Sequence, residues 1–158
     1  MNSVVGARIA TKSTFPWHGW LLGGIFLLYS SAAAYDYIMS LTLGESYYRA
    51  CGMNDAQINY FLNLPDWAVV GWALSVWGGL FGSLALLFRQ RIASTLFAFS
   101  LLGSLGYILY TLGLSAGREA MGGVWFMPIV LAGLTAVLIF YCRRLVGHNQ
   151  VFIERKIK

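Results

Sequence analysis

One carboxylate stands beside a stretch of sequence that otherwise has the composition of a membrane span. Asp36 follows a long apolar run and is flanked by Tyr35 and Tyr37. Acidic side chains within or next to a span are candidates for function, and their usual role is coupling to protons or cations. The sequence therefore makes Asp36 the first candidate for a site that acts on a solute.

The expected depth of Asp36 favours a structural role instead. Asp36 comes 19 residues after Trp17, which is about 28 Å along a helix. A hydrocarbon core is about 30 Å thick, so the carboxylate is expected near the outer boundary. There it would accept hydrogen bonds from Tyr or Trp of other helices, or pair with Arg49 or Arg118. A solute or coupling site stays open as the alternative.

Aromatic residues with a polar tip gather in the same outer half. Seven of the nine tyrosines map there, together with three tryptophans. Such rings suit the headgroup belt of a membrane, and this is the favoured interpretation. The alternative is an outward-opening pocket for a sugar or a cationic solute. The residues of this candidate polar site, structural or solute-binding, are Asp36, Tyr35, Tyr37, Trp67, Trp72, Tyr107, Tyr110 and Trp125.

The sequence contains no recognisable catalytic or metal-binding pattern. It has no HExxH, GxSxG or phosphate-loop motif and no paired carboxylates at catalytic spacing. Cys51 and Cys142 are expected about a membrane thickness apart, which excludes a disulfide between them. Neither has a CxxC or His-rich neighbourhood. We therefore expect no enzyme activity, no metal and no cofactor.

The charge map predicts the elements that carry these residues. Hydrophobic residues make up 58% of the 158 residues and charged residues 11%, whereas soluble proteins carry about 25% charge. Four charge-free intervals of 22 to 26 residues are each long enough for a helix to cross a bilayer. We predict an all-α integral membrane four-helix bundle that forms one domain, 1–158. Its spans are expected at about 16–40, 66–88, 92–115 and 126–144.

The beginning of the chain has some features of a secretory signal. Arg8 and Lys12 precede the apolar run Gly19–Tyr29, and three alanines at 32–34 imitate a cleavage site. The apolar stretch is long enough to span the membrane, however. We expect it to be retained as the first span.

Positive charge predicts the orientation of the four spans. One side, which holds both termini and the 89–91 turn, carries nine of the eleven Lys and Arg residues. The positive-inside rule places this side in the cytoplasm, with a basic tail at 145–158. The net charge of +5 is then topological and lies against anionic lipid rather than nucleic acid. The expected location is a bacterial inner membrane.

Local signals refine the spans and the long outer loop, 43–65. Asn54 followed by Gln57 resembles a capping box and predicts a short amphipathic helix at about 55–63. Pro128 predicts that the last span becomes regular only near that residue, after an irregular outer segment at 121–127. Ser13 or Thr14 is expected to cap the first span.

Small residues on the second and third spans indicate close helix packing. They follow the small-xxx-small pattern that lets backbones approach in lipid. Packing inside the bundle is the favoured interpretation, and contact with another chain is the alternative. The predicted packing residues are Gly78, Gly79, Gly82, Ser83, Gly103 and Gly106.

Several short blocks recur, in this order, in a family of short four-span proteobacterial membrane proteins. The blocks in this chain are Pro16-Trp17-His18, Tyr35-Asp36-Tyr37-Ile38-Met39, Tyr60-Phe61, Pro65-Asp66-Trp67, the Trp72–Gly79 and Gly82–Leu87 segments, and Arg89-Gln90-Arg91. The chain resembles this family over about residues 15–110, and the likeness fades over the fourth span. The family is largely uncharacterised, and some members carry the label "sugar transporter". The resemblance implies a Gram-negative inner membrane and a role with solutes.

One departure from the family pattern weakens that implication. Members tend to have a polar stretch before the Asp-Tyr pair, where this chain has two serines and three alanines at 30–34. A hydrophilic path along the first span is therefore less expected here.

Two functions follow from these observations. The favoured one is a small non-catalytic protein that packs with itself or with another membrane protein, as an accessory or assembly subunit. Its support is that the embedded faces hold almost no charge beyond Asp36. The alternative is a carrier for a small solute such as a sugar, necessarily oligomeric because four helices leave little room for an aqueous path.

Overall fold

The computed structural model describes residues 16–147, and the predicted cap at Ser13 or Thr14 and most of the basic tail lie outside them. Within this range the chain is helical, with no strand. Four helices are long and apolar enough to cross a membrane. They are α1 (Trp17–Leu43), α4 (Asp66–Leu87), α5 (Ala93–Ile108) with its π-helical continuation η1 (Leu109–Leu114), and α7 (Met127–Gly147). The predicted all-α membrane bundle is confirmed.

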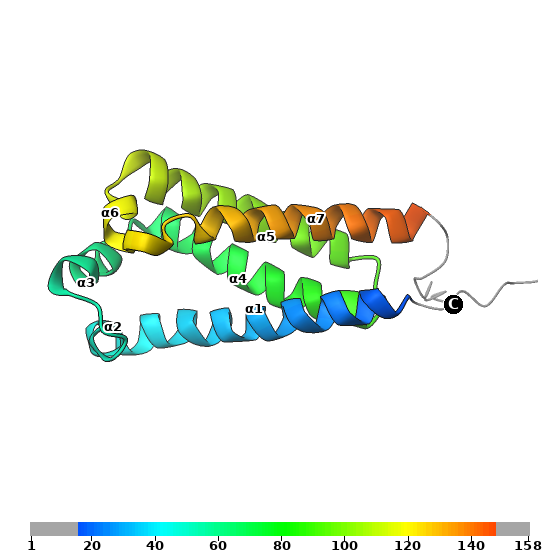
Figure 1. The fold of residues 1–158 in the computed structure, drawn as a ribbon, viewed down its shortest axis with the longest axis horizontal. Coiled ribbons are helices and arrows are strands. Elements are labelled where there is room, and N and C mark those ends of the chain that lie inside the picture. The colour runs from blue at the N-terminus through cyan, green and yellow to red at the C-terminus, as the bar shows by residue number, and fades with distance from the viewer. Residues whose placement is uncertain (1–15, 148–158) are drawn as a thin grey trace, which may run out of the picture.

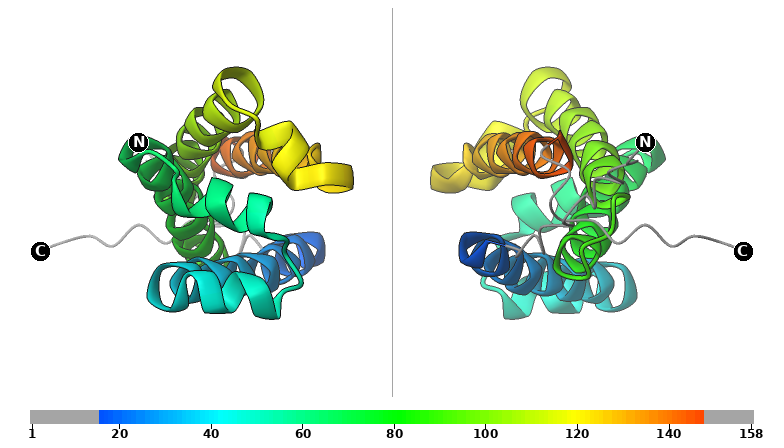
Figure 2. Two further views of the ribbon diagram at one scale, coloured as in Figure 1. Left: turned by 90° about the vertical axis from the view of Figure 1, so that its left-hand side faces the viewer. Right: turned by 90° about the vertical axis from the view of Figure 1, so that its right-hand side faces the viewer.

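The four long helices run side by side (Figure 1) and, viewed from their ends, form an arc rather than a closed ring (Figure 2). Helix α1 packs on α4, α4 on α5, and α5 on α7. Helices α1 and α7 are not packed along their lengths, although the rings of His18 and Tyr141 lie 5.7 Å apart where α1 begins and α7 ends. We call this the terminal end of the bundle. The arc therefore has a seam between its first and last helices.

Glycines set the close approach of α4 and α5 at the centre of the arc. A Cβ atom added at Gly103 would lie 2.5 Å from the carbonyl oxygen of Gly71 and 2.7 Å from the backbone nitrogen of Ser75. Similar backbone contacts surround Gly78, and at Gly82 the added atom would meet the ring of Phe97. Small residues thus let the two backbones touch, which stabilises helix pairs in lipid.

The remaining predicted packing residues take different places. Gly79 faces the hydroxyl of Ser30 on α1, and the buried Ser83 donates a hydrogen bond to the Gly79 carbonyl. No atom lies within 4 Å of a Cβ added at Gly106. Among residues 16–147, the side-chain position of Gly106 therefore faces open space.

Serine hydroxyls add hydrogen bonds between the same two helices. Ser100 donates to the carbonyl oxygen of Ser75 at 2.7 Å, and the hydroxyls of Ser104 and Ser75 lie 3.0 Å apart. Hydrogen bonds of this kind between spans contribute about 0.6–2 kcal/mol. Apolar contact and polar contact therefore act at the same helix pair.

Four short elements lie together at the opposite end, which we call the loop end (Figure 1). They are α2 (Glu45–Ala50), α3 (Asp55–Leu62), α6 (Gly117–Met121) and η2 (Gly122–Val124). Helix α3 and its capping box confirm the prediction for 55–63. Helix α7 begins at Met127, as Pro128 predicted. Helices α2 and α6 were not predicted. The segment expected to be irregular at 121–127 consists mainly of the 3-10 turn η2 and two further turn residues before α7.

Orientation can be tested with the two free cysteines, since Cys51 is exposed at the loop end and Cys142 is buried near the terminal end. If the termini are cytoplasmic, a membrane-impermeant maleimide added to intact cells will label the protein. The Cys51→Ser variant should lose this labelling. Labelling that requires permeabilised membranes would reverse the predicted orientation.

A matched pair of glycines tests the α4–α5 contact. Gly103→Ala should lower the free energy of unfolding by about 1–3 kcal/mol, because the new methyl group overlaps backbone atoms. Gly106→Ala, one turn away in open space, should leave stability unchanged or slightly raised. Unfolding midpoints in detergent give the comparison. Equal midpoints for the two variants would contradict the packing described here.

Candidate functional site

A cavity of about 320 Å³ lies between the four long helices. Its walls come from α1, α4, α5 and α7, and residues of α2, α3, α6 and η2 line it at the loop end. This volume falls at the small end of the range of ligand pockets, about 300–1,000 Å³. The bundle thus contains room for a small organic molecule near the loop end.

One face of α1 supplies much of the lining. Phe26, Ser30, Ala33, Asp36 and Ser40 all line the cavity. Their spacing of three or four residues brings them to one side of a helix. The adjoining side of α1 carries the buried glycines and Ala34 that pack toward α4. Because α1 turns its small residues toward α4, Asp36 on the adjoining side faces the cavity.

The carboxylate of Asp36 has one protein partner in the described chain. The hydroxyl of Tyr47 on α2 donates to its Oδ1 atom at 2.8 Å. This hydrogen bond to a carboxylate, followed by desolvation, raises the pKa of Tyr47 above its usual value. Among residues 16–147, Asp36 makes no ion pair. The prediction of a tyrosine partner is confirmed, but the partner comes from the loop and not from another span.

The predicted ion pair of Asp36 with an arginine is wrong. Arg49 instead bonds Glu45 and Asp55, both at 2.8 Å, and these hydrogen bonds raise the pKa of its guanidinium group. Arg118 lies over the ring of Trp125, 4.6 Å from its centroid. Both arginines have nearer partners within the loop end.

Aromatic rings form one wall of the cavity. Trp72 on α4 and Tyr107 on α5 line the cavity, with their ring centroids 6.2 Å apart. Tyr37 packs edge-on against two tryptophans of α4, with ring centroids 5.1 Å from Trp72 and 6.5 Å from Trp77. Edge-to-face contacts at these distances hold rings in place. The orientation of Trp72 is thereby fixed from two sides.

Hydroxyl groups lie among the apolar side chains that line the cavity. Ser75, Ser104 and Thr135 line the cavity, and Thr135 donates to the carbonyl of Leu131. Ser40 differs from these, since its residue is 5% exposed and its hydroxyl has no hydrogen-bond partner. A buried polar group without a partner costs about 1–3 kcal/mol. The oxygen of Ser40 is shielded from solvent, so the described chain leaves this hydroxyl unsatisfied.

Helices α2 and α3 cover the cavity at the loop end, and α3 crosses the bundle there (Figure 2). Tyr48 of α2 is buried against Phe61 of α3, and both line the cavity. Helix α2 lies between Gly44 and Gly52, whose φ angles of 52° and 80° favour glycine. Helix α2 is thus flanked by backbone turns that residues other than glycine adopt poorly.

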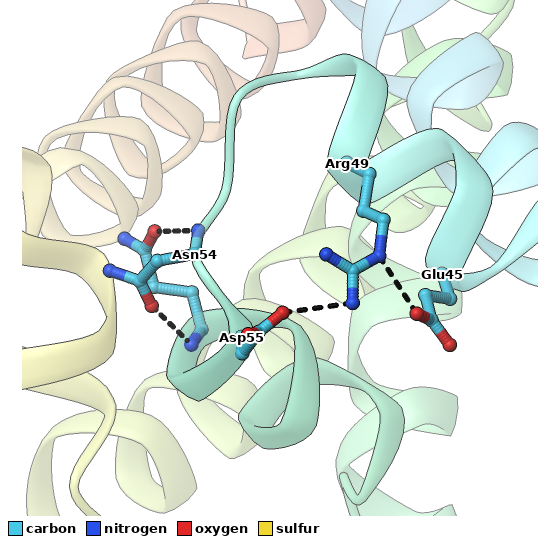
Figure 3. A network of polar contacts seen from close by, with 5 residues as sticks. Glu45, Arg49, Asn54 and Asp55 are labelled. Atoms are coloured by element: carbon cyan, nitrogen blue, oxygen red, sulfur yellow. Dashed lines mark hydrogen bonds and ion pairs between the residues drawn. The ribbon is translucent and has the colours of Figure 1, made fainter.

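Polar contacts connect α2 and α3 to each other and to the segment between α5 and α7. Arg49 bridges α2 to the start of α3, beside the capping box of Asn54 (Figure 3). The Gln57 amide donates to the carbonyl of Ala120 in α6 at 2.8 Å. Tyr60 lies 2.7 Å from the Ser115 hydroxyl, and burial raises the pKa of this phenol. The two helices of the cover are therefore joined to each other by Arg49, and α3 is attached to the segment between α5 and α7.

The cavity is closed toward the terminal end. The ring of Phe26, which lines it, packs edge-on against Phe97 at 5.8 Å. Below this contact the bundle is filled by a cluster of buried apolar side chains. The cluster consists of Ala85, Leu86, Ala93, Phe97, Leu138 and Cys142.

The structure divides the predicted site residues into two groups. Asp36, Trp72 and Tyr107 line one cavity, and Tyr37 contacts the ring of Trp72. The others lie outside the lining: Tyr35 is 59% exposed, Trp67 and Tyr110 pair with each other at 5.3 Å, and Trp125 lies under Arg118.

Several lining residues were not predicted from the sequence. The helical spacing of Tyr29, Ala33, Asp36 and Ser40 could have indicated the α1 face. No comparable signal marks the lining of α7, because apart from Thr135 it consists of apolar residues like those on the other faces of that span.

Comparisons with protein-family models, with curated proteins and with solved structures give no match to this chain.

The hydrogen bond to Asp36 predicts unusual titration of Tyr47. Because its pKa is raised, the stabilisation from this bond is complete below about pH 10 and is lost only as the pH rises through the higher folded value. The difference in phenolate absorbance between wild type and Tyr47→Phe should therefore appear above pH 10. Repeated in an Asp36→Asn background, the same difference should move down toward pH 10. A difference at pH 10 in both backgrounds would show that the bond does not form.

Proposed function

We propose that this membrane protein binds a small organic solute in the cavity between its helices, as the binding step of a small carrier. The observation that supports this most is a cavity of about 320 Å³ whose lining combines one carboxylate, several hydroxyls and aromatic rings. A bundle that served only to pack would gain stability by filling this space with side chains. One lining hydroxyl, that of Ser40, is also buried without a hydrogen-bond partner, which is unfavourable.

A bundle that is filled at its terminal end and hollow at its loop end fits one conformational state of a carrier. The terminal half is filled and held at His18 and Tyr141, and the cavity is in the other half. If the termini are cytoplasmic, the site would exchange with the outer side. The sugar label of the family that the chain resembles agrees with a solute role.

Packing with a second chain is the other candidate function. Its support is that Gly24, Gly106 and Gly133 have open space where a side chain would begin, which would let another helix approach. The mass of the detergent-solubilised protein and its co-purifying chains tests this. A lone protomer would remove the subunit hypothesis.

Filling the cavity tests solute binding without removing a polar group. Thermal unfolding in detergent is measured with sugars, amino acids, carboxylates and organic amines. A solute at one hundred times its Kd should stabilise the protein by about 2.7 kcal/mol. Ala33→Leu, which projects into the cavity, should abolish the shift. Ala32→Leu, exposed on the neighbouring face, should keep it.

Two results would contradict solute binding at this site. One is that no solute in the panel raises the unfolding midpoint. The other is a shift that survives Ala33→Leu, which would place the binding elsewhere.

A further inference from the structure

The charge of the cavity lining limits what can bind there. Asp36 is the one charged residue among the described residues that line it, and no lysine, arginine or histidine accompanies it. The arginines of the loop end are held by Glu45, Asp55 and Trp125, outside the lining. A ligand in the cavity therefore meets one negative charge with no positive side chain to balance it.

The carboxylate has unused capacity for hydrogen bonds. Tyr47 donates to Oδ1, whereas an ionised carboxylate offers about four acceptor positions. Asp36 is exposed in the structure, so these positions are open to solvent or to a ligand that enters the cavity. A bound cation would balance the charge of this carboxylate, and a second anion would be repelled.

Aromatic faces surround the same space. Six rings line the cavity, from Phe26, Tyr29, Tyr48, Phe61, Trp72 and Tyr107. Rings attract a cation through their negative faces, and tryptophan does so best. Neutral sugars also stack on aromatic rings, but they need several polar partners for their hydroxyls, and a lone carboxylate is of little use to them.

Ser40 indicates a second feature of the ligand. It lies one helical turn from Asp36 and lines the same cavity, and its buried hydroxyl has no partner. After rotation of its side chain toward the cavity, this hydroxyl would bond a polar group of the ligand about one helical turn away from a cation held at Asp36.

We propose that the solute is a small organic cation, with an ammonium group at Asp36 against the aromatic wall and a second polar group at Ser40. This assignment rests on the proposed function and specifies its ligand class. The ammonium could belong to a free amine or to the headgroup of a lipid, since α1 and α7 are not packed along their lengths.

Binding of choline to the full-length protein in detergent tests the assignment. Its neutral isostere, 3,3-dimethylbutan-1-ol, has the same shape without the charge, and glucose represents neutral sugars. Choline should bind at least about tenfold more tightly than the isostere, as expected when a cation–π contact and an ion pair are lost. Glucose should not bind. Repetition with phosphatidylethanolamine added to the micelles separates the two sources, because a lipid-headgroup site would lose choline binding.

Variants identify the groups responsible. Asp36→Asn should abolish choline binding, and Asp36→Glu should retain part of it. Trp72→Leu should weaken choline about tenfold while changing the affinity for the neutral isostere little. Unfolding midpoints without ligand show whether each variant folds, and the exposed Tyr35→Leu serves as a matched aromatic control that should bind normally.

The possible outcomes separate the two proposals. If the isostere or glucose binds as well as choline and Ala33→Leu abolishes that binding, the cation assignment is overturned and solute binding in the cavity stands. If choline binds equally to Asp36→Asn, the assignment to Asp36 is overturned. If no solute binds and Ala33→Leu changes nothing, both proposals fall.

Discussion

The close approach of α4 and α5 is the contact on which the rest of the bundle depends. Gly71, Gly78 and Gly103 bring the two backbones together, and Ser75, Ser100 and Ser104 join them by hydrogen bonds. Hydrophobic driving force between helices is absent in lipid, so this pair must be held by packing and polar contacts. Helices α1 and α7 then attach to opposite edges of the pair.

The cavity follows from the same small residues. Ser75, Gly79 and Ser104 face the space between α1 and α7 and do not fill it. These positions therefore have two roles, since their size lets helices meet on one side and leaves a void on the other. Larger side chains at these positions would disturb both the helix contact and the site. Stability and binding are thus linked at the level of single side chains.

Much of the fold could be predicted because the physical signals are strong. Uncharged stretches located the four long helices, Asn54 and Gln57 marked the start of α3, and Pro128 marked the start of α7. The helical spacing of residues in the first span also indicates which of them share a face with Asp36. These features depend on local sequence or on the solvent, and neither requires knowledge of how helices cross.

The missing parts depend on tertiary geometry. Helix α2 lies between two glycines with positive φ, and its turn brings Tyr47 back to Asp36. The sequence does not indicate such a path. Which tyrosines face the cavity depends on helix rotation, and so Tyr107 lines it whereas Tyr110 pairs with Trp67. The π-helical turns of η1 also change the rotation of the residues that follow them.

The length of α1 makes the bilayer itself a variable of this protein. Its 27 residues extend about 40 Å, against roughly 30 Å of hydrocarbon. A helix longer than the membrane is thick accommodates the mismatch by tilting. The residues of α1 that pack toward α4 are mostly small, and α1 meets α7 through rings at one end. A change in the tilt of α1 would therefore alter mainly the distance between α1 and α7 along the seam. The same chain would then have an interior of different shape in membranes of different thickness.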